Sequence, residues 1–160
     1  MATDFFLVLD GIKGESQDSK HKDQSEIISW SCGASQSGTT HSGTGSGGGK
    51  CAVHDLSLTK YTDKSSPVLW QHCLTGKHIK KGKLICRKAG EKPLEYLTIE
   101  LEDIMISNVS QGGHGGEDRL TESISLNFGQ FHQKYAQQNA DGSKGAEVEH
   151  KYNIAQNKQM

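Results

Sequence analysis

Apolar and polar residues alternate along most of this chain, which is typical of β-strands with one buried face. The alternation predicts strands at residues 5–9, 28–32, 51–61, 84–88, 94–109, 120–135 and 148–155. In the second of these, Ile28, Trp30 and Cys32 share one parity, and Ser29 and Ser31 share the other. Because successive side chains of a strand point to opposite faces, one face should be apolar and the other small and polar. The charged stretch 13–24 is expected to be a long solvated loop.

Two of the longer strands shift phase within their length. The apolar residues at 97, 99 and 101 face one way, and those at 104 and 106 continue the series out of phase. A β-bulge near Glu102 and Asp103 would account for the shift, because it inserts one extra residue. The next strand repeats the pattern, with Leu120, Ile124, Leu126 and Phe128 in one phase, then Gly129, then Phe131 and Tyr135.

One short helix is predicted after the strand at 51–61. Ser65 or Ser66 can cap its start, Pro67 suits its first turn, and Gly76 suits the position just past its end. Two pairs of apolar residues lie one turn apart and should form the face that packs on the sheet: Leu69 with Cys73, and Trp70 with Leu74. The fold class expected is therefore mainly β, an antiparallel β barrel of two packed sheets with one short flanking α-helix.

Charge and hydropathy narrow the possible partners. Lys and Arg number 18 against 19 Asp and Glu in 160 residues, and neither sign forms a long block. Nucleic-acid-binding proteins normally carry a basic patch, so this class is excluded. The apolar run 5–9 is too short for a signal peptide, and no stretch approaches the ~20 apolar residues of a membrane helix. We expect a protein made in the cytoplasm, not inserted in a membrane, and exported, if at all, without a cleaved signal peptide.

Cysteine and histidine spacing argues against a metal site. The four cysteines Cys32, Cys51, Cys73 and Cys86 form no CxxC pair and no compact framework, so we expect reduced, mostly buried thiols. Cys51 with His54, or His72 beside Cys73, could begin a zinc site, but no second pair of suitable spacing follows. No metal and no other cofactor is predicted.

A glycine-rich segment precedes the strand at 51–61. Residues 43–48 satisfy GxGxxG, but they lead into a strand, whereas a dinucleotide-binding loop leads into a helix. We interpret the segment as a long flexible loop. It comprises Gly38, Thr39, Thr40, His41, Ser42, Gly43, Thr44, Gly45, Ser46, Gly47, Gly48 and Gly49.

A second glycine-rich segment carries charged residues. It comprises Gly112, Gly113, Gly115, Gly116, Glu117, Asp118 and Arg119. Asp118 and Arg119 are expected to fix a turn or to pair with a neighbouring molecule across an interface. The adjacent carboxylates should diverge, and the chain has no GxSxG motif, so no catalytic residue and no enzymatic activity is predicted.

Several motifs in one order resemble the haemolysin-coregulated protein (Hcp) family of type VI secretion tube proteins. They are DGIKGES at 10–16, SWS at 29–31, DLSLTKYTDKSSP at 55–67, RKAG at 87–90, GGHGGEDRLTE at 112–122, LNF at 126–128 and YNIA at 152–155. The resemblance covers nearly the whole chain and implies one tube domain over residues 1–160.

The resemblance implies a structural protein that forms hexameric rings stacked into a hollow tube, which is exported and can carry effectors in its lumen. It also implies a contractile sheath, a spike protein at the tube tip and effector proteins as partners. With this architecture, Ser29 and Ser31 are expected to line the lumen, and the loop 38–49 to join stacked rings, with 112–118 as the second candidate. The alternative function is a monomeric small β-barrel binding module.

Overall fold

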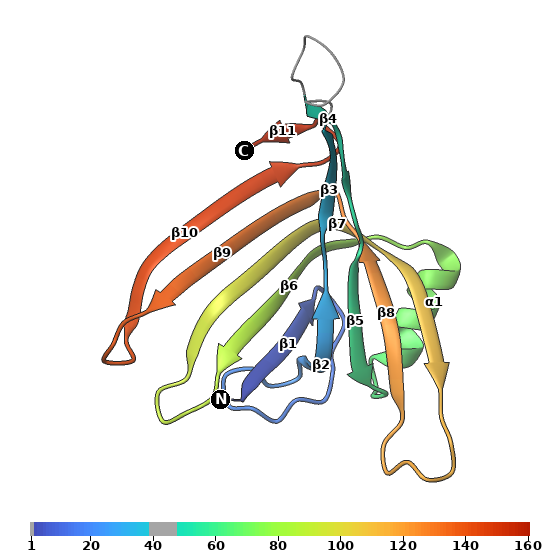
Figure 1. Cartoon of the computed structure of the whole chain (residues 1–160). Helices are drawn as coiled ribbons and strands as arrows, with labels where there is room; N and C mark the ends of the chain where they lie inside the picture. Colours follow the sequence, from blue (N-terminus) through green and yellow to red (C-terminus); the bar gives the residue numbers. More distant parts are fainter. Residues whose placement is uncertain (1, 39–47) are drawn as a thin grey trace.

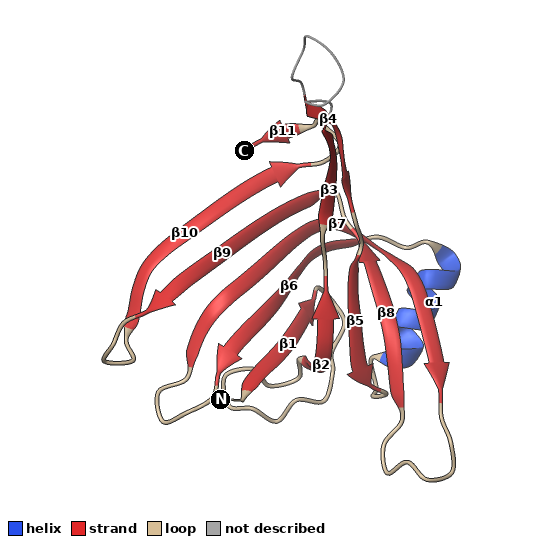
Figure 2. Cartoon of the chain, viewed as in Figure 1, coloured by secondary structure: helices blue, strands red, loops and turns tan. Residues whose placement is uncertain are grey.

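Six antiparallel strands close into a barrel in this computed structural model, which describes residues 2–38 and 48–160. The strands are β1 (Thr3–Leu9), β2 (Ser25–Ser31), β3 (Ala34–Gly38), β4 (Gly48–Val53), β5 (Leu56–Tyr61), β6 (Ile79–Lys88), β7 (Leu94–Gly112), β8 (Thr121–Asn127), β9 (Gln130–Gln138), β10 (Lys144–Asn153) and β11 (Lys158–Gln159), and α1 (Ser66–Thr75) is the helix. The barrel order is β7-β6-β1-β2-β5-β8, and pairing of β8 with β7 closes it. The predicted class, a mainly β antiparallel barrel with a short helix, is confirmed (Figures 1 and 2).

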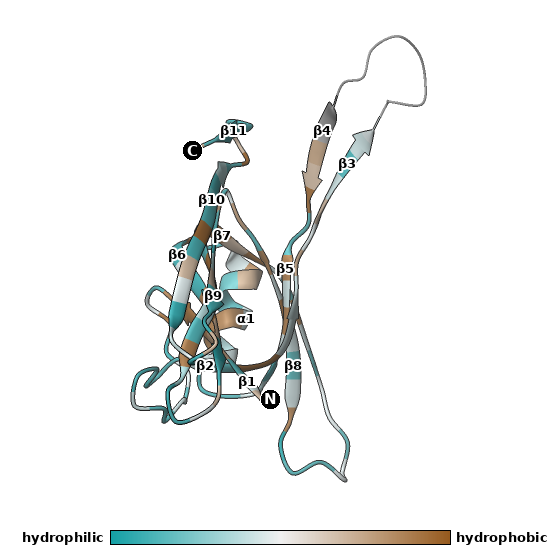
Figure 3. Ribbon diagram, turned by 60° about the vertical axis from the view of Figure 1, so that its left-hand side comes forward, coloured by the Kyte–Doolittle hydropathy of each residue, from teal (hydrophilic) through white to brown (hydrophobic). Residues whose placement is uncertain are grey.

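Two further parts extend beyond the barrel. Strands β9, β10 and β11 continue the sheet outward from β7, and we call these three strands the flange. Strands β3 and β4 pair only with each other among the described residues and form a hairpin that projects away from the barrel (Figure 3). The strand expected at 51–61 is therefore divided. Its first residues belong to the hairpin in β4 and its last to the barrel in β5, because the chain leaves one sheet for the other at His54 and Asp55.

A kink in β7 lets one strand serve both the barrel and the flange. Asp103 has φ 54°, a left-handed conformation that is uncommon outside glycine. Strand β7 pairs with β9 up to Glu102 and with β6 up to Ile104, and from Met105 onward it pairs with β8. The N–H of Gly129 donates to the carbonyls of Glu102 at 3.0 Å and Asp103 at 3.2 Å, so the opposing chain bends at the same point. The predicted change of phase is present, since Leu101 and Ile104 are both buried. The predicted bulge is not, because the register of β7 with β6 continues unbroken from Glu102 to Ile104, and the left-handed residue Asp103 changes the phase without an inserted residue.

The strand expected at 120–135 consists of two strands that both run along β7. The break between β8 and β9 falls at Phe128 and Gly129, where the phase shift was predicted. A Cβ atom on residue 129 would lie 3.2 Å from the Cβ of Asp103, so the close approach of the two chains favours glycine there. Leu120 does not belong to the buried series, since it precedes β8 and is 51% exposed.

The core lies inside the barrel and is almost entirely aliphatic. Alternate positions of each strand supply it, as expected for sheets with one buried face. The buried cluster comprises Leu7, Leu9, Ile27, Leu56, Leu58, Leu69, Ile79, Leu84, Ile99, Leu101, Ile104, Ile106, Ile124, Leu126 and Phe128.

The parity predicted for the second strand is wrong at one residue. Ile27 is buried, whereas Ile28 is 41% exposed. The pairing of β2 with β5 shifts between Ile27 and Ser29, so Ile28 is the extra residue of a bulge and joins the outer face. Beyond the bulge the predicted faces hold, because Trp30 packs against the core and Ser29 and Ser31 are exposed.

Helix α1 has the predicted ends but a different buried face. Gly76 follows it with φ 70°, and its N–H donates to the carbonyl of His72 at 2.9 Å. Leu69 is buried, and Cys73 packs against the core as predicted. Trp70 and Leu74 point away from the barrel and are 38% and 77% exposed, because a helix on a barrel buries only one stripe. No helix in the described chain is long and apolar enough to cross a bilayer.

A buried ion pair connects α1 to the barrel, and the sequence pattern did not predict it. Lys60 of β5 is fully buried and donates to Glu122 of β8 at 2.6 Å, to Asp63 at 3.0 Å and to the carbonyl of Tyr61 at 2.9 Å. Ser66, the first residue of α1, also donates to Glu122, at 2.6 Å. All three ammonium hydrogens therefore have acceptors, which offsets the cost of removing the charges from water.

Replacing Lys60 with Ala should lower the free energy of unfolding by about 3–5 kcal/mol, because Glu122 would remain buried without its cation. Urea denaturation followed by circular dichroism measures the change. Lys81→Ala is the matched control, since Lys81 lies 3.8 Å from Glu102 with side-chain exposures of 70% and 43%. Its loss should be below about 1 kcal/mol, and an equally small loss for Lys60→Ala would contradict the stabilising role assigned to the buried pair.

Candidate functional site

The outer face of one side of the barrel carries two rows of small polar side chains. The strands in this region follow the order β2-β5-β8-β7, and the register aligns one residue from each strand. The first row is Ser31, Ser57, Ser125 and Asn108, and the second is Ser29, Thr59, Ser123 and Ser110. We call these eight residues the serine face. The predicted lumen residues Ser29 and Ser31 are brought together on it.

The sequence pattern identified two of these eight residues and missed six. The signal was present as alternation in β5 and β8, where Ser57, Ser123 and Ser125 occupy the parity opposite the buried leucines and isoleucine. What the pattern could not provide was the register that aligns them. Strand pairing is a tertiary property, since residues 68 positions apart become neighbours: Ser57 and Ser125 have their hydroxyl oxygens 3.5 Å apart.

The serine face is wettable and uncharged. Every side chain in it is short and can both donate and accept hydrogen bonds. Just beyond the first row is the carboxylate of Asp55, which accepts from the hydroxyl of Ser107 at 2.6 Å and from the amide of Asn127 at 2.9 Å. Such a surface can hydrate well and make many weak polar contacts, but it offers no nucleophile activated by a base and no convergent set of acids.

Both edges of the sheet that bears the serine face are open over part of their length. Among the described residues, β7 pairs after residue 104 only with β8, and β2 pairs from residue 29 to 31 only with β5. Each edge therefore presents backbone N–H and C=O groups that another strand can bind.

The glycine-rich loop predicted at 38–49 is only partly within the described residues. Gly38 ends β3, and Gly48 and Gly49 begin β4, so these three belong to strands and not to the loop, since the hairpin pairs as far as Gly38 with Gly48. The other predicted members of the loop, residues 39–47, lie outside the described residues.

Gly112 ends β7, and residues 113–120 form the turn that joins β7 to β8. The N–H of Glu117 donates to the carbonyl of His114 at 3.2 Å, and the side chains of these two residues are 3.1 Å apart. Arg119 places its guanidinium carbon 3.7 Å from the ring centre of Tyr61 in the same chain, a cation–π contact. A role of this exposed turn at an interface stays a prediction.

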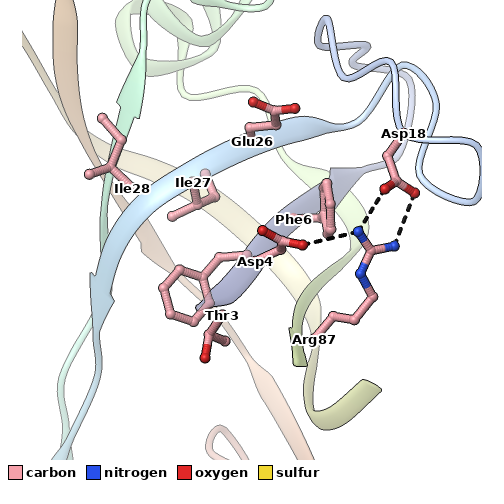
Figure 4. A pocket seen from close by; sticks show the side chains of 9 residues that line it. Thr3, Asp4, Phe6, Asp18, Glu26, Ile27, Ile28 and Arg87 are labelled. Carbon is pink, nitrogen blue, oxygen red and sulfur yellow. Dashed lines mark hydrogen bonds and ion pairs between the residues drawn. The ribbon is translucent and has the colours of Figure 1, made fainter. Parts of the chain in front are cut away.

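A cleft of about 260 Å³ surrounds a second charged cluster, shown in Figure 4. Arg87 donates to both oxygens of Asp18, at 3.0 and 2.6 Å, and to Asp4 at 3.1 Å, and its guanidinium carbon is 4.9 Å from the ring centre of Phe6. These contacts raise the pKa of Arg87, and its guanidinium holds the pKa of the Asp18 carboxyl well below its usual range. The guanidinium of Arg87 is already hydrogen-bonded to these two carboxylates. We therefore interpret the cluster as a structural contact that holds the loop 13–24 against the barrel and not as a ligand site.

The loop 13–24 is not fully solvated, contrary to expectation. His21 is buried, stacks on Phe6 with ring centres 4.4 Å apart, and has Nε2 2.7 Å from Glu95. Ser16 is also buried. The charged composition of the loop misled the prediction, because Asp18 and His21 pair with Arg87 and Glu95, which are distant in sequence, while Lys13, Glu15, Lys20 and Lys22 stay exposed.

The cysteines are less buried than predicted. Only Cys86 is buried, and the other three are intermediate. Burial raises the pKa of the Cys86 thiol to about 12 and also raises the pKa of Cys32, so these thiols stay protonated and unreactive near neutral pH. No group of three or more His, Cys, Asp or Glu residues in the described parts of the chain could hold a metal ion.

Comparisons with known proteins all point to one group. Residues 6–135 match the family model described as type VI secretion system effector, Hcp. The chain is 50% identical over 161 aligned residues to the protein hcp1 of Pseudomonas aeruginosa, with 99% of each chain covered. It is similar to the crystal structure of Hcp1 from Salmonella typhimurium (34% identity, TM-score 0.82, all of both chains covered) and to the structure of a type six secretion system protein (26% identity, TM-score 0.94, 99% and 100% covered).

The Asp18–Arg87 pair predicts a specific dependence of stability on pH. The folded-state pKa of Asp18 is lower than its unfolded value, so the pair stabilises the fold above the unfolded pKa and loses this effect as pH falls through the folded pKa. Asp18→Asn should therefore be less stable than wild type at neutral pH, with a difference that shrinks below about pH 4. Thermal unfolding measured from neutral to acidic pH tests this.

The control for that series is Asp10→Asn, because Asp10 is exposed at the end of β1. It should match the wild-type profile. A stability deficit of Asp18→Asn that stayed constant down to the lowest pH would contradict the assignment to the carboxylate charge.

Proposed function

The chain belongs to the Hcp family of secreted type VI secretion tube proteins, and from this membership we propose that it is a ring-forming subunit whose stacked rings make a hollow tube. The family is one of structural proteins and not of enzymes. The observation that carries the proposal is the serine face, an uncharged polar surface on a sheet with an open edge at each end.

The strand order makes edge-to-edge pairing between copies possible. The sheet β2-β5-β8-β7 contains four strands that alternate in direction, so β2 and β7 run in opposite directions. If neighbouring copies are related by a rotation about an axis parallel to the strands, each strand runs in the same direction in every copy. The open part of β7 in one copy then lies antiparallel to β2 of the next, and such a contact between unlike surfaces closes into a ring. The ring order of six comes from family membership.

The serine face is the surface that we assign to the lumen. Small hydroxyl side chains leave a channel wide and wettable, and they bind cargo by many weak contacts. The opposite, outward part of the sheet is charged, with Glu100, His132 and Glu149 in a row across β7, β9 and β10. A surface of mixed charge suits contact with solvent or with a surrounding protein layer. Family membership favours the contractile sheath as that layer.

We further propose that the rings stack, carry effector proteins and contact a spike protein at the tube tip. We assign the stacking contact to the hairpin that carries residues 38–49, since β3 and β4 project beyond the barrel (Figure 3). The turn 112–118 at the end of β7 is the second candidate. Secretion by the type VI system is a property of the family.

Native mass spectrometry tests the ring. We expect a homo-hexamer at micromolar concentration, because each copy contributes two unlike open edges. A monomer across that concentration range would contradict the ring and would favour the alternative function, a small binding module.

Replacing Ser31 with Gln tests the lumen assignment. Ser31 is exposed and its backbone pairing is independent of the side chain, so hexamers should form normally. Six longer side chains would narrow the channel, and we expect retention of a co-purified effector to fall about tenfold or more, equivalent to about 1.4 kcal/mol. Ser19→Gln, in the exposed part of the loop before β2, is the matched control and should retain cargo. Loss of the ring in Ser31→Gln would show that Ser31 is buried between subunits.

A further inference from the structure

The flange has a largely apolar face that the rest of the described chain covers only in part. Register pairs Phe131 with Tyr152, Gln133 with His150 and Tyr135 with Val148, so these six residues share one face of β9 and β10, which we call the flange face. Tyr135 is 47% exposed and Val148 71%. The charged row of the same strands, with His132 and Glu149, lies on the opposite face. The flange is therefore amphipathic, yet its apolar side extends beyond the barrel core.

Four residues of the flange face form one wall of a groove beside the barrel: Phe131, Gln133, His150 and Tyr152. This groove has a volume of about 510 Å³. Phe131 stacks between Phe128 and His150, with ring centres 5.7 and 5.4 Å away, and makes that wall aromatic. The other wall comes from the base of the projecting hairpin, with Ala34 of β3 and Val53 of β4. The groove is concave and largely apolar.

A protruding apolar patch lies on the other side of the molecule. Trp70 and Leu74 are one turn apart on the outer stripe of α1. Leu74, at 77%, is the most exposed large apolar side chain of the described residues. Figure 1 shows the flange to the left of the barrel and α1 to its right, behind β8 and the end of β7. We call Trp70 and Leu74 the helix knob.

We propose that the helix knob of one copy packs against the flange face of the next copy, so that the groove is a docking site for a second copy of this chain. The inference rests on the proposed ring. The side with the open edge of β7 also carries α1, which contacts β7 and bonds to Glu122 of β8 through Ser66. On the other side, the open edge of β2 continues directly into β3, a wall of the groove. The rotation that pairs the two edges thus brings knob and groove together.

The two surfaces suit each other chemically. Neither the knob nor the groove wall carries a formal acid, and His54 and His150 are the only titratable imidazoles lining the groove. Burial of exposed aromatic and aliphatic side chains in a preformed apolar groove is the type of contact that dominates protein interfaces. The knob and the groove are different surfaces of one chain, so the contact repeats from each copy to the next. The copies form a closed ring when the rotation between neighbours adds up to a full turn.

Two variants with a new charge test the contact. Leu74→Asp places a carboxylate on the knob, and Val148→Asp places one on the flange face; both residues are exposed, so the fold should be retained. We expect the concentration at which half of the chains are in rings to rise about tenfold or more for each variant. Ala89→Asp, an exposed alanine in the turn after β6, is the matched control and should assemble as wild type. Native mass spectrometry measures the populations, and circular dichroism confirms the fold.

Mixing the two variants tests the pairing itself. A Leu74→Asp chain keeps an intact flange face, and a Val148→Asp chain keeps an intact knob. At the concentration where wild-type rings form, an equal mixture should give heterodimers, each with one native contact, while each variant alone stays monomeric. Rings that persist in either variant, or a mixture without heterodimers, would overturn the docking site while the ring itself stands. A wild-type monomer would instead overturn the proposed function. If both variants form rings but no longer retain an added effector peptide, the groove is a binding site for cargo and not for a second copy.

Discussion

The barrel depends on one kink, shared by two chain segments that run side by side. At Asp103 the long strand β7 takes a left-handed conformation, and opposite it the chain turns at Gly129, whose N–H bonds to both Glu102 and Asp103. A straight β7 would pair with the same neighbours along its whole length and leave the sheet open. The kink redirects its second half to β8, which closes the barrel, and leaves β9 free to start the flange. Closure also removes the edges that an open sheet would expose.

The position of α1 follows from a different constraint, the satisfaction of buried charge. Lys60 and Glu122 lie inside the wall of the barrel, and a buried charge is tolerated only with complete hydrogen bonding. Ser66 supplies one of these bonds and is the first residue of α1, so the start of the helix is held against β8. Leu69 and His72 then face the barrel, and Trp70 and Leu74 necessarily face outward. An internal electrostatic requirement thus determines which apolar residues are presented to other molecules.

The chemistry of the molecule is distributed over surfaces and not concentrated in a pocket. Its buried charges are paired within the chain, as with Arg87 between Asp4 and Asp18, and its thiols are held protonated where burial raises their pKa. What remains available is the uncharged serine face, two open strand edges and an apolar groove opposite an apolar knob. These features support the proposed ring-forming function, and the chain belongs to a family of secreted tube proteins.

Local pattern determined much of this structure, because strand faces and helix ends depend on near neighbours. The alternation identified most strands, the change of phase at Asp103, the helix between Ser65 and Gly76, and the exposure of Ser29 and Ser31. The alternation failed at Ile28, because a bulge inserts one residue there without a signal in the pattern. The prediction also failed at Trp70 and Leu74, because helical periodicity does not say which of two apolar stripes is buried. Only the tertiary structure decided the register that aligns Ser57 and Ser125 with Ser31, the pairing of Lys60 with Glu122, and the groove beside the flange. Each joins residues distant in sequence, and such contacts are set by the path of the whole chain.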